Sequence, residues 1–313
     1  MRKGKRFVWI FIALVLGLMA VYQIALKLTK ECTAEAWSQL VEHLYEPKSL
    51  GFIVLALILM PVNWMLEAWK WKHACSQNIS LTFYQALQSI CSGLFTGFFM
   101  PGRVTEFVGK IAYVDKNYRA TATAIHGLLS QIQFFITLIF GITAWLINSS
   151  QPSKTIQLFL VLAVAITLTS MGIIIKYQHL LVVKIQRFFP NQKTIPNLML
   201  LSPGYLIPIV SFSVIRYFVF STQFILIAQA CHLQVECSEF IFGLPIYFLI
   251  TSAIPMISVF EPAIRTLTAL YVFGGSTENT LTFGLNITLV WFINLVLPGL
   301  WGYYRFIKRS LKQ

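Results

Sequence analysis

Apolar residues occur along the chain in long runs separated by short polar and charged segments. A helix needs about 20 residues to cross the ~30 Å hydrocarbon core of a bilayer, and six of the runs reach that length. They predict an all-α polytopic membrane protein. The six predicted transmembrane helices are residues 7–26, 50–69, 120–147, 156–175, 205–231 and 281–304.

Two further apolar stretches are interrupted by proline. Residues 81–100 run into Pro101-Gly102-Arg103, and residues 239–273 are interrupted at Pro255 and again at Pro262. Proline removes a backbone donor and breaks a helix. Broken backbone at membrane depth is tolerated only where protein or a watery cavity surrounds it. We therefore expect two re-entrant hairpins, 81–115 and 239–273, with Pro101, Gly102, Pro255 and Pro262 as the breakers.

Composition and charge support a membrane protein. The chain is 57% hydrophobic and only 11% charged, whereas a soluble domain has about 25% charged residues. The net charge of +13 could indicate nucleic-acid binding, but no such motif is present, and basic residues also collect on the cytoplasmic side of membrane proteins. The N-terminal apolar run is too long for a secretory signal, so it is expected to be retained as a span.

The distribution of charge predicts the topology. The basic ends of the chain and the basic segment 176–193 lie in the cytoplasm if both hairpins return to the side they entered, and the acidic segments 31–46 and 232–239 then lie outside. We predict one integral membrane domain. Its parts are an N-terminal helix and outer loop (1–48), a first repeat (50–147), a connecting span (156–175), a second repeat (205–304) and a basic cytoplasmic tail (305–313).

The two predicted hairpins share a pattern. An Ala-Cys pair precedes each one, and each contains a proline, then a glutamate, then a cation four residues after the glutamate. The matching residues are Cys75, Pro101, Glu106 and Lys110 in the first and Cys231, Pro255, Glu261 and Arg265 in the second. The preceding spans run in opposite directions, so the repeat is inverted, as in many transporters. Chance similarity between two proline-broken apolar segments is the alternative.

Ionisable residues at membrane depth are costly and are candidates for function. Arg103, Arg216 and Arg265 are predicted to bind a lipid head group, because a guanidinium binds oxyanions through two parallel hydrogen bonds. The residues predicted to pair charges or couple protons are Glu67, Glu106, Lys110 and Glu261. The alternative is that these charges only lock the hairpins into the bundle. Asn63 shares a helix face with Glu67, and the nearby Trp64, Trp69 and Trp71 are expected to form an interfacial belt.

No metal or cofactor site is predicted. The five cysteines form no CxxC pair, and the five histidines show no H-E-x-x-H spacing. The chain also has no P-loop, so ATP is not expected to act on it directly.

The hairpin sequences resemble those of a known family. Pro101-Gly102-Arg103-Val104-Thr105-Glu106 is similar to the P-x-R-x-G-E motif of the lysylphosphatidylglycerol synthase transmembrane region, the flippase-like domain family. The stretch from Ile254 to Glu261 resembles that family's second motif. Thr105 replaces the glycine of the first motif, and Ser258 and Val259 make the second less glycine-rich than is usual in the family. The resemblance implies lipid translocation or lipid binding, and no aminoacyl transfer, because the family's soluble synthase domain has no counterpart here.

The function predicted from the sequence is translocation of a lipid in the bacterial inner membrane. The lipid is expected to be an anionic phospholipid or a polyprenyl-phosphate-linked lipid, and a homo-oligomer is possible. One alternative is a non-catalytic scaffold or partner subunit. Another is a lipid-modifying enzyme, for which His126 and Ser130 share a helix face; no third orienting group is evident, so the chain is predicted not to be an enzyme.

Overall fold

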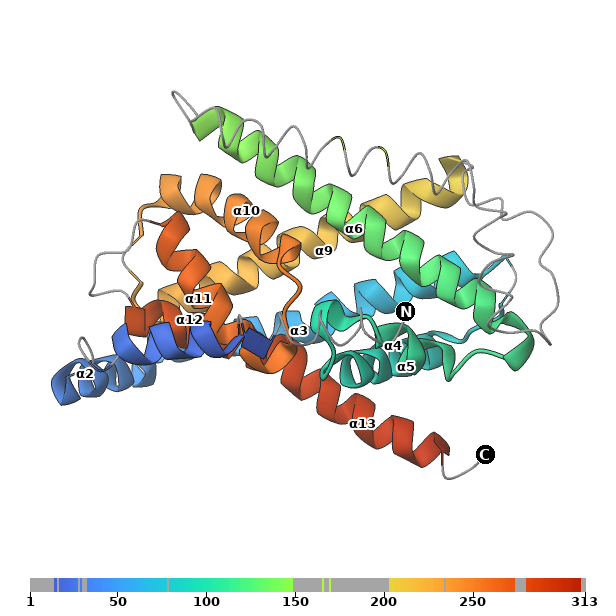
Figure 1. Cartoon of the computed structure of the whole chain (residues 1–313), viewed down its shortest axis with the longest axis horizontal. Coiled ribbons are helices and arrows are strands. Elements are labelled where there is room, and N and C mark those ends of the chain that lie inside the picture. Colours follow the sequence, from blue (N-terminus) through green and yellow to red (C-terminus); the bar gives the residue numbers. More distant parts are fainter. Residues whose placement is uncertain are drawn as a thin grey trace.

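The computed structural model describes residues 14–15, 17–27, 29, 33–77, 79–148, 165, 169, 203–233, 235–273 and 280–310. In these ranges the chain folds into helices and short connections, with no strand (Figure 1). The described part of the predicted first span is helical. The predicted span 156–175 and the basic segment 176–193 lie outside the described residues, apart from residues 165 and 169.

Four of the described helices are long and apolar enough to cross a membrane. They coincide with four of the six predicted spans, and their outward side chains include exposed residues such as Ile58, Leu146 and Ile207. Lipid accepts such a surface, whereas water does not. The four are α3 (Pro47–Cys75), α6 (Arg119–Asn148), α9 (Pro203–Ala230) and a continuous helix built from α12 (Thr280–Trp291), the π-helical turn η5 (Phe292–Val296) and α13 (Leu297–Ser310).

Each predicted hairpin consists of two helices joined by an irregular segment that contains a 3₁₀ turn. The first helix of the first hairpin begins at a capping box between Thr82 and Gln85. The first hairpin comprises α4 (Phe83–Gly97), η1 (Pro101–Arg103) and α5 (Glu106–Ile111), and the second comprises α10 (Cys237–Ala253), η3 (Ser258–Phe260) and α11 (Glu261–Val272). Outside the hairpins are α2 (Ala34–Tyr45), which precedes α3, and η2 (Lys116–Tyr118), which precedes α6.

The predicted helix-breaking residues differ in their conformation and in their position relative to the helices. Gly102 has a φ of 61°, a left-handed conformation that favours glycine, and Pro255 lies in the extended segment between α10 and η3. Pro262 lies in the first turn of α11, where a missing N–H costs nothing. The prediction of a separate interruption at Pro262 is therefore wrong, because this proline begins a helix.

Replacing Gly102 by alanine is expected to destabilise the protein by about 1–2 kcal/mol, the cost of a Cβ in the left-handed region. An added Cβ would come no closer than 3.9 Å to another side chain, so it would not clash. The loss of stability would therefore measure the backbone strain alone. Gly102→Asn should cost less, because asparagine tolerates this conformation. Thermal unfolding in detergent measures both variants. Gly127→Ala, in open space on α6, is the control, and an equal effect there would contradict the explanation.

The helices of the two halves pack reciprocally (Figure 1). The first long helices, α3 and α9, pack along each other. The last helix of each half packs on the first hairpin helix of the other half, α6 on α10 and α13 on α4. Glycine permits both contacts, since an added Cβ on Gly141 would meet Leu249 and one on Gly302 would meet the Cys91 carbonyl. The two halves thus form one bundle.

The predicted basic tail is partly built into this bundle. Helix α13 continues through Ser310, so the described part of the predicted tail is helical and continuous with the last long helix. Arg309 donates from Nε to the Ala112 carbonyl at 2.8 Å and lies over the Tyr113 ring. Arg305 lies over the Tyr84 ring. These arginines bind the first hairpin instead of standing free in water.

Candidate functional site

The tips of the two hairpins meet. The Gly102 amide donates to the Met256 carbonyl at 3.1 Å, which joins the irregular segments directly. Beside this contact, Nη2 of Arg103 donates to both oxygens of Glu261, at 2.9 and 3.1 Å. Glu261 also accepts from the Ser258 hydroxyl at 3.1 Å and lies 3.4 Å from Arg265. The structure therefore joins the two motifs that the sequence singled out.

A cavity of about 230 Å³ lies beside the hairpin tips. Its walls come from both hairpins and from α3, α6, α9, α12 and η5. All three arginines predicted to bind a head group, Arg103, Arg216 and Arg265, line it. Their side chains keep between 21% and 27% of their surface exposed, so they are not sealed in the protein interior.

Arg216 is held by side chains of α3. It donates from Nε to Asn63 Oδ1 at 2.9 Å and from Nη1 to Glu67 at 2.7 Å, and its guanidinium lies 4.9 Å from the Trp64 ring centroid. Asn63 in turn donates to Asn294 at 3.1 Å. Asn294 belongs to the π-helical turn η5, and such turns are frequent at functional sites.

A second group of charges lies behind the cavity wall and does not line it. Glu67 pairs with Lys70 at 2.6 Å, and Lys110 pairs with Glu106 at 2.7 Å and lies 3.7 Å from Glu67. Both lysines are almost fully buried. His126 Nδ1 lies 3.2 Å from the Lys110 ammonium. Such buried pairs join α3, α5 and α6, which fits the locking role considered from the sequence.

The charges that line the cavity do not balance. Its walls carry three arginines and one carboxylate, Glu261. Arg216 also pairs with Glu67, but Glu67 and Glu106 already face two lysines, Lys70 and Lys110. The whole cluster of five cations and three carboxylates therefore has an excess of two positive charges. One carboxylate offers about four acceptor sites, whereas each guanidinium has five N–H donors. The cavity therefore has more donors and more positive charge than its own acceptors satisfy, which suits an anion carrying one or two charges.

Several polar atoms in the residues lining the cavity also lack partners. Four of them are hydrogen-bond donors that are buried without a hydrogen bond to the described residues. They are Trp64 Nε1, Tyr217 Oη, Arg265 Nε and Trp291 Nε1. An unsatisfied buried donor costs about 1–3 kcal/mol, so native proteins usually supply a partner such as water or an ion. Protein atoms cover these four donors, so they do not face the open space of the cavity.

Sequence reasoning was wrong about two of the tryptophans. Trp64 lines the cavity and Trp71 is fully buried with its ring 5.6 Å from the Lys110 ammonium, so neither belongs to an interfacial belt. Trp69 is 46% exposed and fits one. The predicted second span ends at residue 69 and so leaves Lys70 outside it, yet Lys70 is buried. Its position three residues after Glu67 was the signal for their pairing.

The proposed catalytic pair for a lipid-modifying enzyme is not formed. The Ser130 hydroxyl donates to the His126 backbone carbonyl at 2.9 Å. The His126 ring lies instead beside Lys110. A nucleophile needs a base within hydrogen-bond reach of its hydroxyl, and this arrangement does not provide one.

No protein-family model matches the chain, and none of the curated proteins is significantly similar to it. The geometry of the cavity defines the class of site: a cavity with three arginines and largely apolar walls, among helices long and apolar enough to cross a membrane. We therefore infer the function from that geometry.

Proposed function

We propose that this chain is a lipid translocator of the bacterial inner membrane, and that its cavity binds an anionic lipid head group. The observation that carries the proposal is that Arg103, Arg216 and Arg265, which come from three separate parts of the chain, line one cavity with a single carboxylate. Guanidinium groups bind phosphate oxygens in pairs. Glu261 holds Arg103 and Arg265 in place between ligands.

The size of the cavity supports a head group rather than a whole lipid. At about 230 Å³ it holds several water molecules, since each water occupies about 30 Å³ of liquid. A phosphate with a small polar substituent fits this volume, and two acyl chains do not. The tails of the lipid would therefore stay in the bilayer while the head group enters the protein.

The proposed membrane arrangement is six spans with two re-entrant hairpins in an inverted repeat, and both termini in the cytoplasm. Helices α4 and α10 have 15 and 17 residues. At 1.5 Å per residue they are about 22 and 26 Å long, shorter than the ~30 Å hydrocarbon core. The reciprocal packing of the two halves and the contact between the hairpin tips also support the repeat.

A flipping assay with matched arginine variants tests the proposal. Protein is reconstituted in liposomes that contain tail-labelled fluorescent phosphatidylglycerol, and an impermeant reductant is added. Quenching should proceed beyond the outer leaflet for the wild type. Arg103→Gln and Arg216→Gln each remove one positive charge from the cavity wall. Each should slow flipping about tenfold or more, because a hydrogen bond to a charged group contributes about 1.5–3 kcal/mol.

Arg309→Gln is the matched control. It removes the same type of side chain and the same charge, but Arg309 contacts the Ala112 carbonyl and does not line the cavity. Its flipping rate should equal that of the wild type. Equal rates for the wild type, Arg103→Gln and Arg216→Gln would remove the cavity from the mechanism, and quenching limited to the outer leaflet would contradict translocation of this lipid.

A further inference from the structure

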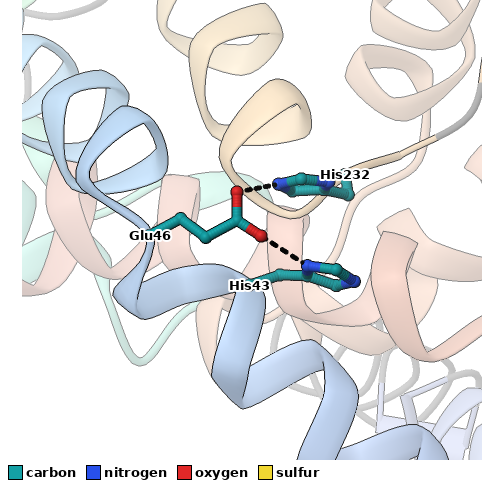
Figure 2. A group of neighbouring side chains, drawn as sticks. All are labelled: His43, Glu46 and His232. Atoms are coloured by element: carbon teal, nitrogen blue, oxygen red, sulfur yellow. Dashed lines mark hydrogen bonds and ion pairs between the residues drawn. The ribbon is translucent and has the colours of Figure 1, made fainter.

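A group of three potential metal ligands lies at one end of the α3–α9 pair, at a site unrelated to the cavity. Figure 2 shows His43 and Glu46 beside the corner between α2 and α3, and His232 just after the end of α9. Both imidazole rings direct a nitrogen toward the Glu46 carboxylate. His43 Nδ1 lies 2.8 Å from one carboxylate oxygen, and His232 Nε2 lies 3.3 Å from the other.

The backbone holds these three residues in place. Glu46 is at once the last cap of α2 and the first cap of α3, so a single residue forms the corner. His232 follows α9 with a φ of 53°, a left-handed conformation in a position where helices usually place glycine. The conformation turns the chain sharply after α9. The His232 ring then lies parallel to the His43 ring, with centroids 4.3 Å apart.

The chemical state of the group suits a cation. A glutamate carboxylate is ionised near neutral pH, so Glu46 offers a negatively charged ligand. Both histidines keep more than 40% of their side-chain surface exposed, which leaves the nitrogens open to ions from water. Two imidazoles and one carboxylate are a ligand set that zinc takes, with a fourth position left for water.

We propose that His43, Glu46 and His232 form a binding site for one Zn²⁺ ion, which joins the α2–α3 corner to the end of α9.

The distances fit this ion after a small movement. Zinc binds nitrogen at about 2.0–2.1 Å and oxygen at about 2.0–2.2 Å, so neighbouring ligand atoms in a tetrahedral site lie roughly 3.3 Å apart. The three ligand atoms, one from each residue, all lie within 4.8 Å of one another. The 2.8 and 3.3 Å contacts run from the two histidines to different oxygens of Glu46, so the side chains must shift for one ion to reach all three. The stacked rings must tilt so that their nitrogens converge. Ser49, whose hydroxyl is 3.4 Å from His232 Nε2, is placed to bind water in the fourth position.

The ion would link the α2–α3 corner to the end of α9 and so stabilise the fold. Helices α3 and α9 pack along each other at the centre of the fold, and Glu46 and His232 are at the end of this pair. An ion that binds only the folded arrangement raises stability in proportion to the logarithm of its concentration above the dissociation constant. Zinc would thus stabilise the contact between the two halves. The predicted topology puts all three ligands on the outer side of the membrane, so zinc outside the cytoplasm would reach them.

The test measures zinc directly. Full-length protein without a polyhistidine tag is stripped with a chelator, titrated with Zn²⁺ in detergent and followed by calorimetry and by metal analysis after dialysis. We expect about one ion per chain, a thermal midpoint that rises with zinc, and no competition from millimolar Mg²⁺, because imidazole ligands favour zinc over magnesium. Glu46→Gln and His232→Asn should each weaken zinc binding about tenfold or more.

The variants are chosen to keep the fold. Asparagine tolerates the left-handed conformation of residue 232 and removes only the ligand. His73→Asn is the matched control, because His73 lies at the other end of α3 and contacts the Tyr205 carbonyl. The control should bind zinc as the wild type does. Failure of the wild type to bind zinc, or unchanged affinity in His232→Asn, would overturn the proposal.

A spectroscopic measurement on the wild type does not depend on any variant folding. Cobalt replaces zinc in such sites, and a tetrahedral Co²⁺ complex with nitrogen and oxygen ligands absorbs strongly in the visible range. Appearance of this absorption with one equivalent of Co²⁺, and its loss when Zn²⁺ is added, would support the site. A weak octahedral spectrum alone would contradict it.

Discussion

Glu67→Ala is expected to prevent the protein from folding. Glu67 is the carboxylate that pairs with Lys70 and Arg216 and faces Lys110, and both lysines are almost fully buried. Removing one partner of a buried ion pair costs about 3–5 kcal/mol, because the other charge is left uncompensated. Here three cations lose one anion. The total stability of a native protein is only about 5–15 kcal/mol, so the loss consumes most of it.

Expression level and size-exclusion profile in detergent measure this effect. Glu106→Ala is the matched control, since among the described residues Glu106 forms one ion pair, with Lys110, and it is partly exposed. This variant should be tolerated better. Adding Lys70→Met to Glu67→Ala removes one of the stranded cations and should recover part of the folded protein. A Glu67→Ala protein with the thermal midpoint of the wild type would refute the assignment of this carboxylate as the centre of the network.

Gly302→Ala is expected to have the second-largest effect. An added Cβ at this position of α13 would overlap the backbone carbonyl of Cys91 and crowd the Ser92 amide of α4. Backbone atoms cannot rotate away, so the two helices must separate, and the Ser92 hydroxyl would lose its hydrogen bond to the Gly302 carbonyl. Overpacking costs about 1–3 kcal/mol when side chains can yield, and we expect at least the upper value here.

Gly299→Ala, three residues earlier on the same helix, supplies the comparison. Nothing lies within 4 Å of a Cβ added there, and alanine is the better helix former, so this variant should be as stable as the wild type or more so. Thermal unfolding of the two variants in the same detergent gives the difference. Equal midpoints would mean that α13 and α4 do not approach as closely as described.

The sequence predicted the long helices well because such helices are recognisable from their length and hydropathy. Four of the six predicted spans coincide with described helices long enough to cross a membrane, and both proline-broken stretches contain helices joined by an irregular segment. The sequence also selected Arg103, Arg216 and Arg265, because an arginine in an apolar run is conspicuous. Their presence in one cavity could not be read from the sequence, since it depends on how α9 and the hairpins pack.

Some residues of the site were missed because nothing in the sequence around them indicates a special role. Asn294 is a single amide in an apolar helix, and only its hydrogen bond to Asn63 and its position in the π-helical turn reveal its place at the cavity. Lys70 lies just outside the predicted span 50–69, yet α3 continues to Cys75 and Lys70 is buried. The end of a helix is the least certain part of a prediction from sequence. A charged residue near a helix end is therefore easily predicted to be exposed when it is buried.

The sequence analysis predicted no metal site, and the reason is again that tertiary contacts cannot be read from the sequence. Spacing rules find metal ligands that lie close together in the chain, and none was found. His43 and Glu46 are three residues apart, but the third member, His232, comes from the far half of the sequence. Two neighbouring ligands are common by chance, and only the contact between the α2–α3 corner and the end of α9 makes a set of three.

The reciprocal exchange of helices between the halves has a consequence for biosynthesis. Helix α4 reaches the membrane early, but its partner α13 is the last described helix to leave the ribosome. Until then α4 and the hairpin it belongs to lack their covering helix, as does α6 until α10 arrives. Exposed surfaces of this kind invite aggregation in a partly made chain. The nascent first half must therefore be held by the insertion machinery or by lipid, and a chain released before α13 is complete would be a substrate for membrane proteases.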